Sequence, residues 1–155
     1  MASDRPEPDS AQELRARALR LLARREHSRA ELKRKLGPHA GSAEALDLLL
    51  DALEEKKQLS DARYAGERAH VLTRRFGSAR IRQDLRARGV DEATASLAAA
   101  AAAETDLERA RAIYQRRYRE PAASREERAK RMRFLQGRGF SGDIIRRLVS
   151  GDAED

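Results

Sequence analysis

The sequence contains no cysteine and no tryptophan, and aromatic residues make up only 4% of its 155 residues. The lack of cysteine excludes disulfide bonds, thiolate metal sites and cysteine nucleophiles, and it fits a reducing compartment. So few aromatic side chains argue against one thick globular core. They favour thin, closely packed helices whose apolar content is alanine and leucine.

The chain also lacks a long hydrophobic run. Its alanine tract, 98–103, is far shorter than the roughly 18 apolar residues that a membrane helix requires. The segment 1–9 is polar, holds two prolines and has no signal-peptide pattern. We therefore expect a soluble, cytoplasmic protein that does not bind membranes.

Catalytic and metal-binding patterns are missing as well. The three histidines, His27, His39 and His70, show no ligand spacing, and no glycine-rich phosphate-binding motif is present. The acidic pairs at 54–55 and 126–127 are adjacent in sequence, so their side chains point in different directions on a helix. We expect no enzyme activity, no metal and no cofactor.

Positive charge is in excess, with 33 basic against 26 acidic side chains and a formal charge of +7. This balance favours a polyanion or an acidic protein surface as the partner. A GC-rich genome alone also enriches a protein in arginine and alanine, so the charge by itself does not decide between a binding surface and an ordinary solvated one.

Helix-start signals recur along the chain. Each is a capping box, in which a Ser or Thr side chain and a Glu three residues later satisfy free backbone N–H groups. The four boxes are Ser10/Glu13, Ser28/Glu31, Thr105/Glu108 and Ser124/Glu127. No segment alternates as a strand does. We predict nine helices: 12–26, 29–36, 42–57, 61–75, 78–88, 92–103, one from 106 that ends before Pro121, 125–137, and one lined by Ile144, Ile145, Leu148 and Val149, with Met132 and Leu135 facing inward from 125–137.

An internal repeat organises these helices. Leu85-x-x-Arg88-Gly89-Val90 reappears as Leu135-x-x-Arg138-Gly139-Phe140, and Leu36 takes the equivalent place earlier in the chain. A period of about 50 residues is typical of helical repeat arrays, which present surface to large partners. We predict an all-α fold of three tandem three-helix repeats in an elongated, curved, solenoid-like array. The predicted bounds are a disordered tail 1–9, repeats 10–58, 59–104 and 105–150, and an acidic tail 151–155.

Basic residues cluster in the second and third repeats, and they are the candidate contact surface. The candidates are Arg74, Arg75, Arg80, Arg82, Arg86, Arg116, Arg117, Lys130, Arg131 and Arg133. Some of them lie at helix C-termini, where a cation also interacts favourably with the helix dipole. Because the aromatic residues fall on apolar stripes, nucleic acid would be bound through its phosphates, without sequence preference.

Two motifs stand in the middle repeat: Asp61-x-Arg63-Tyr64-Ala65 and Gly77-x-x-x-Ile81-x-x-Asp84-Leu85-x-x-x-Gly89-Val90. With these motifs the chain resembles the RecX family of bacterial modulators of the RecA recombinase, and the resemblance extends over about 12–150. The motif residues Asp61, Arg63, Tyr64, Gly77, Ile81, Leu85 and Gly89 are expected to be structural. Asp61 is expected near a helix start, Tyr64 in the packing between repeats, and Gly89 as a left-handed helix stop.

The resemblance implies a non-enzymatic regulator in DNA repair, homologous recombination and the SOS response. Such proteins lodge in the groove of the RecA–DNA filament and limit filament growth, ATP hydrolysis and strand exchange. The expected partner is the RecA filament, with single-stranded DNA contacted through or beside RecA, and the chain is expected to be a monomer. The alternative is a sequence-independent nucleic-acid-binding helical module that acts without RecA, because a short helix, a break and a second helix are also typical of helix-turn-helix proteins.

Overall fold

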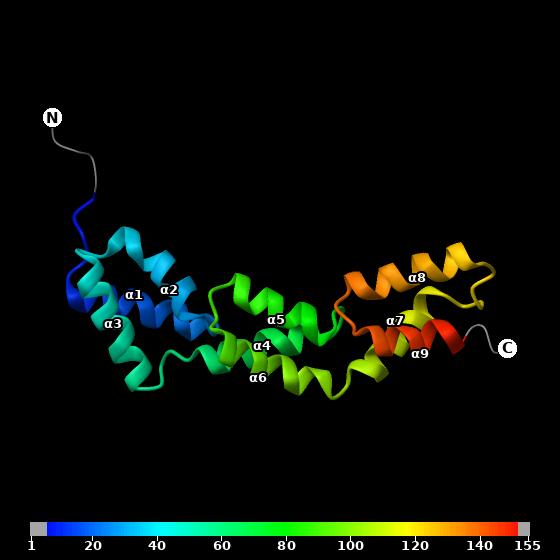
Figure 1. The fold of residues 1–155 in the computed structure, drawn as a ribbon. Coiled ribbons are helices and arrows are strands. Elements are labelled where there is room, and N and C mark those ends of the chain that lie inside the picture. The colour runs from blue at the N-terminus through cyan, green and yellow to red at the C-terminus, as the bar shows by residue number, and fades with distance from the viewer. Residues whose placement is uncertain (1–5, 152–155) are drawn as a thin grey trace. The chain divides into compact units, whose positions relative to one another are not determined.

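The computed structural model describes residues 6–151, and these residues form nine α-helices, one short 3₁₀ helix and no strand (Figure 1). The all-α prediction is therefore confirmed. Residues 1–5 and 152–155, which fall in the two predicted tails, lie outside the described residues. Within 6–151 no helix combines the length and apolarity needed to cross a membrane.

The helices divide between two compact units. The first unit comprises the described residues up to Ala65 together with Arg88–Val90, and the second comprises Gly66–Ala87 and the described residues from Asp91 onward. The boundary lies within α4 (Asp61–Leu72), the helix that begins the second predicted repeat.

The first unit contains α1 (Ala11–Arg24), α2 (Arg29–Leu36), the 3₁₀ helix η1 (Gly37–His39) and α3 (Ala43–Glu55). The side chains of Ser10 and Ser28 accept hydrogen bonds from the backbone N–H groups of Glu13 and Glu31, so these two predicted caps are confirmed. Helix α1 ends before the predicted residue 26 because Arg25 adopts an extended backbone.

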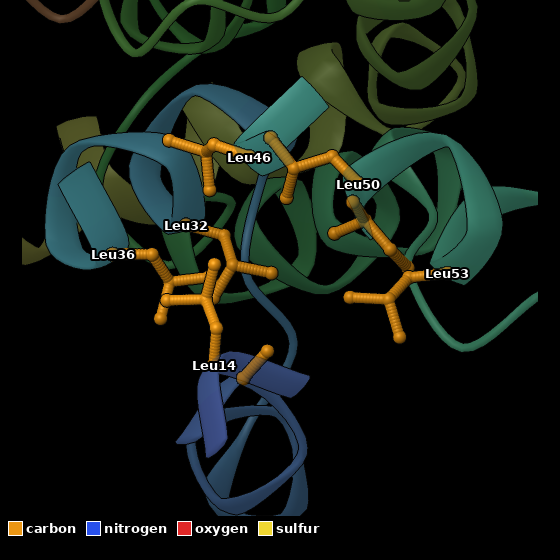
Figure 2. Packing of buried hydrophobic residues seen from close by; sticks show 8 residues of the cluster. Leu14, Leu32, Leu36, Leu46, Leu50 and Leu53 are labelled. Atoms are coloured by element: carbon orange, nitrogen blue, oxygen red, sulfur yellow. The ribbon is translucent and has the colours of Figure 1, made fainter. Parts of the chain in front are cut away.

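Leucines from α1, α2 and α3 form the core of this unit, and Figure 2 shows their side chains gathered between the helices. The buried residues are Leu14, Ala18, Leu32, Leu36, Leu46, Leu50, Leu53 and Leu59. Burying one such leucine contributes about 1.5–3 kcal/mol, so the cluster is the main source of stability in a unit without aromatic core residues other than Tyr64.

Asp9, the last residue of the segment 1–9, is bonded to the first unit. Asp9 forms an ion pair with Arg17, with 2.8 Å between Oδ2 and Nε, and its N–H donates to the carbonyl of His39. These two bonds hold Asp9 against α1 and η1, so ordered packing begins within the segment 1–9.

The second unit contains the rest of α4 followed by five helices. They are α5 (Ser78–Ala87), α6 (Glu92–Ala103), α7 (Asp106–Arg117), α8 (Arg125–Gly137) and α9 (Gly142–Ser150). Ser124 caps α8 as predicted. The predicted box at Thr105 is wrong: its backbone is not extended, and its hydroxyl donates to the carbonyl of Ala102 and accepts from Arg109.

The C-terminal core of this unit combines Ala110 and Tyr114 of α7 with apolar residues of α8 and α9. The other members are Leu135, Phe140, Ile145 and Val149. Met132 was predicted to face this core, but 38% of its surface is exposed. Its neighbour Arg131, one helical turn before Leu135, is buried instead.

An aspartate at the start of one repeat caps a helix of the repeat before it. In the first unit Asp61, the first residue of α4, accepts the backbone N–H of Arg29 at 2.7 Å, at the start of α2. In the second unit Asp106, the first residue of α7, accepts the N–H and hydroxyl of Ser78, at the start of α5. Both carboxylates satisfy free N–H groups and interact favourably with the helix dipole.

In each unit a glycine also packs closely against the helix that the aspartate caps. Gly89 and Gly139 have φ of +87° and +91°, so the left-handed stop predicted at Gly89 is confirmed, and Gly139 adopts the same conformation. A Cβ atom on Gly89 would lie 2.5 Å from Cβ of Ala30, and one on Gly139 would lie 2.4 Å from Cβ of Arg80. Only glycine fits either place, and the same contact recurs in both units.

Most of the other family-motif residues are buried within the two units, and Arg63 is the exposed exception. Ile81 and Leu85 are fully buried, and Tyr64 is 6% exposed. A Cβ on Gly77 would lie 2.4 Å from the carbonyl oxygen of Gly139. Arg63 forms an ion pair with Glu26 in the first unit.

Candidate functional site

The predicted contact residues divide by burial. Nine of the ten basic side chains are exposed: Arg74, Arg75, Arg80, Arg82, Arg86, Arg116, Arg117, Lys130 and Arg133. The tenth, Arg131, is only 3% exposed. All ten belong to the second unit.

Four of the exposed residues share a hollow of about 560 Å³, which we call the arginine hollow. It is lined by Arg74, Arg75, Ile113, Arg116, Arg117, Phe134 and Arg138. Three chain segments therefore meet here: the residues after α4, the last turns of α7, and the end of α8. Its lining contains five guanidinium groups and no carboxylate.

Two of these guanidinium groups are held in place by the protein. The guanidinium carbon of Arg117 lies 4.7 Å from the centre of the Phe134 ring, and that of Arg138 lies 5.1 Å from the same centre. Arg138 also donates to the carbonyl of Arg75 at 3.1 Å. Cation–π contacts of this kind fix the charges beside the hollow while leaving most of their N–H donors available.

The cluster combines five arginines with no carboxylate partner in the described part of the chain. Several arginines elsewhere in the described residues do have acidic partners: Arg17 contacts Asp9, Arg25 contacts Glu31, and Arg29 contacts Asp47, Asp51 and Glu54. By contrast, within the described chain no carboxylate lies at ion-pair distance from Arg74, Arg75, Arg116, Arg117 or Arg138. The hollow therefore brings together five positive charges without an acidic partner among the described residues.

The arginines of α5 are engaged inside the second unit. Arg82 and Arg86 both form ion pairs with Glu92 of α6, and a hydrogen bond from Ser96, aided by Arg82, lowers the pKa of that carboxyl. Arg80 donates to the carbonyl of Gly137 at 2.7 Å and covers the ring of Phe76. These three residues offer a partner less free charge than the hollow does.

Arg131 is placed in the interior, contrary to its predicted role at the surface. Its guanidinium donates to the hydroxyl of Tyr114 at 3.1 Å and the carbonyl of Glu120 at 2.9 Å, and it pairs with Glu127 at 2.7 Å. Although burial alone would lower the pKa of Arg131, the bonds to Tyr114 and Glu127 raise it above its usual value. The side chain therefore stays charged and ties α7 to α8.

The register of α8 explains this placement. Arg131 precedes Leu135 by four residues, as Leu32 precedes Leu36 and Ile81 precedes Leu85, and all three preceding side chains are buried. The burial of Arg131 could therefore have been predicted from its position four residues before the repeated leucine. Arg138 follows Leu135 by three residues, as Arg88 follows Leu85, and it lines the hollow although it is not among the contact residues that the sequence predicts.

Titratable groups in the first unit serve packing. His27 is 1% exposed; its Nδ1 lies 3.1 Å from the carbonyl of Arg25, and its Nε2 lies 3.2 Å from Nζ of Lys35. Burial lowers the pKa of His27. The hydrogen bond from Arg25 lowers the pKa of Glu31 to about 2. Residues 6–151 contain no cluster of three or more metal-ligating side chains.

Comparisons with known proteins agree on one family. Residues 15–38, 60–98 and 104–149 match the first, second and third three-helix domains of RecX. The chain is 46% identical over 149 residues to the regulatory protein RecX of Leptothrix cholodnii, covering 96% of this chain and 92% of that protein. It is 43% identical to the regulatory protein RecX of Ralstonia pickettii, covering 96% of this chain and 94% of that protein.

Solved structures show the same fold. The crystal structure of RecX from Lactobacillus salivarius superposes with a TM-score of 0.82 at 20% identity, covering 94% of this chain and 97% of that one. A second crystal structure, of a regulatory protein RecX, gives a TM-score of 0.74 at 22% identity, covering 90% and 74% of the two chains. With the three matching domains and this extent of identity, the chain belongs to the RecX family of non-enzymatic regulatory proteins.

Proposed function

We propose that this chain binds the RecA–DNA filament in its groove and limits filament growth, ATP hydrolysis and strand exchange. Membership of the RecX family implies modulation of RecA, and this is the coarser part of the statement. The observation that supports the finer part is the concentration of exposed, carboxylate-free arginines in the second unit. A filament of RecA on DNA combines protein surface with a polyanion, so a cationic surface fits it.

The contact surface that we propose consists of exposed basic residues of the second and third repeats. It includes the four predicted residues of the arginine hollow, Arg74, Arg75, Arg116 and Arg117, and extends to Lys130 and Arg133 on α8. Arg80, Arg82 and Arg86 contribute less because their charges are partly neutralised or held by backbone carbonyls. Arg131 does not belong to the surface because it is buried.

The direct test is ATP hydrolysis by RecA on single-stranded DNA, with the purified chain added in increasing amounts. We expect the wild-type chain to reduce hydrolysis, and the charge-reversal variant Lys130→Glu/Arg133→Glu to reduce it less. The matched control is Arg20→Glu/Arg34→Glu, which alters two exposed first-unit arginines without an ion pair in the described chain and changes the net charge equally.

Unchanged hydrolysis at stoichiometric excess of the wild-type chain would contradict the proposal. The alternative, a nucleic-acid-binding module that needs no RecA, predicts tight binding to naked DNA and no effect specific to RecA. A DNA-binding assay without RecA, run beside the hydrolysis assay, tests the alternative: tight DNA binding together with unchanged hydrolysis by RecA would support it, whereas reduced hydrolysis supports the proposed function whether or not the chain also binds DNA.

A further inference from the structure

We propose that the arginine hollow is a binding site for clustered phosphates, meaning two or more phosphate groups linked in one ligand. All residues that line the hollow come from this chain, so the proposal holds whether or not RecA is the partner. Linked phosphates occur in a nucleic-acid backbone and in a small polyphosphate, and both present the same chemistry to the hollow.

The chemistry of the lining points to phosphate. A guanidinium group offers a planar fork of N–H donors that matches the oxygens of a phosphate in bidentate fashion. Five such groups surround one hollow without an intervening carboxylate, so a single phosphate would leave most of them unused. A ligand with adjacent phosphates engages several at once.

The size and pre-arrangement of the hollow agree with a bound ligand. Its volume of about 560 Å³ lies within the roughly 300–1,000 Å³ of ordinary ligand sites. Arg117 and Arg138 already rest against the Phe134 ring, and Arg138 is fixed by the carbonyl of Arg75. Side chains ordered before binding lose less conformational entropy when the ligand arrives.

The same arrangement limits what part of the ligand is recognised. Phe134 is the only aromatic residue in the lining, and two guanidinium groups lie over its ring. The ring is therefore not free to stack a base, which is the usual way of gripping the bases of a single strand. The site reads phosphates, and base identity should not affect affinity.

The test uses the full chain without RecA and two probes: inorganic tripolyphosphate, followed by titration calorimetry, and a short fluorescent oligothymidylate, followed by anisotropy. The critical variant is Arg116→Glu/Arg117→Glu, and Arg20→Glu/Arg34→Glu is the control of equal charge. Each charge-assisted hydrogen bond contributes enough that losing two should weaken binding at least about tenfold. The control should weaken it by no more than about threefold, through the overall field alone.

The two probes separate the sources of phosphate. Binding of tripolyphosphate that displaces the oligonucleotide supports a compact site open to small polyphosphates. Binding of the oligonucleotide alone supports a site for the nucleic-acid backbone, with a salt slope of about −0.7 per phosphate neutralised. If both double variants bind each probe equally, or if the wild-type chain binds neither, the proposal is overturned. Helical circular dichroism of every variant verifies that the fold is kept.

Discussion

Removing the Asp106 carboxylate should destabilise the second unit more than any surface change. Its side chain is 6% exposed and accepts the N–H and hydroxyl of Ser78, and it forms an ion pair with Arg109. Arg109 is itself 17% exposed and is held by the carbonyls of Thr73, Phe76 and Ala102. In Asp106→Ala this guanidinium stays in place without its carboxylate.

The expected cost combines two effects. Removing one member of a buried ion pair lowers the free energy of unfolding by about 3–5 kcal/mol, and loss of a helix cap typically lowers it by about 1 kcal/mol. Because the two effects share the same carboxylate, we expect about 3–5 kcal/mol in total rather than their sum. For a chain of this size, the thermal midpoint should fall by roughly 6–20 °C.

The assay is thermal and urea unfolding followed by circular dichroism. Asp106→Asn keeps an acceptor for Ser78 and removes only the charge, so it should lose less stability than Asp106→Ala. Asp143→Ala is the matched control, because Asp143 also pairs with an arginine three residues later but is 87% exposed; it should change stability by less than about 0.5 kcal/mol. An Asp106→Ala variant within about 1 kcal/mol of the wild type would refute the reasoning.

Three further predictions test other contacts. Gly139→Ala should lower the free energy of unfolding by about 2 kcal/mol or more, because φ is +91° and the new Cβ would clash with Arg80. Gly137→Ala is the control: no atom lies within 4 Å of its new Cβ, so it should be neutral or slightly stabilising. Equal urea midpoints for the two variants would contradict this prediction. Burial lowers the pKa of His27 below its unfolded value of 6.5, so the stability that comes from its neutral ring is complete above pH 6.5 and decreases as the pH falls, by up to about 1.4 kcal/mol per pH unit. The variant His27→Gln should lack this pH-dependent part of the stability when unfolding is measured from pH 7 to pH 5. Identical pH profiles for variant and wild type would speak against it. Arg131→Ala should lower the urea midpoint by an amount equivalent to about 1–3 kcal/mol, because the buried hydroxyl of Tyr114 loses the hydrogen bond from Arg131. The ion pair with Glu127 adds little to this cost because that carboxylate is 38% exposed. A midpoint like that of the wild type would show that the side chain is dispensable.

Much of the fold was predictable because its signals are local. Capping serines, apolar stripes at helical spacing and glycines after Leu85 and Leu135 lie within a few residues of what they determine. The contact of Asp106 with Ser78 was not predictable in the same way. The two residues are 28 positions apart, and nothing in either sequence neighbourhood indicates that they meet.

The candidate site was only partly predictable for a related reason. A cluster of arginines in the sequence does not show which of them have an acidic partner. Arg82 and Arg116 therefore look equivalent in the sequence, but in the structure Arg82 is paired with Glu92 and Arg116 lines the hollow. Arg131 looked like part of a basic run because its neighbours are charged. Its helical register, four residues before Leu135, decides its burial, and the repeat would have indicated it.

The most direct test of the central claim is the length of RecA filaments on single-stranded DNA, measured by electron microscopy. With the wild-type chain we expect shorter filaments than with RecA alone, and with the Arg20→Glu/Arg34→Glu control the same shortening. A variant with Arg116, Arg117, Lys130 and Arg133 all changed to Glu should leave the filaments long. Filaments of unchanged length with the wild-type chain, or equal shortening by this variant, would contradict the account.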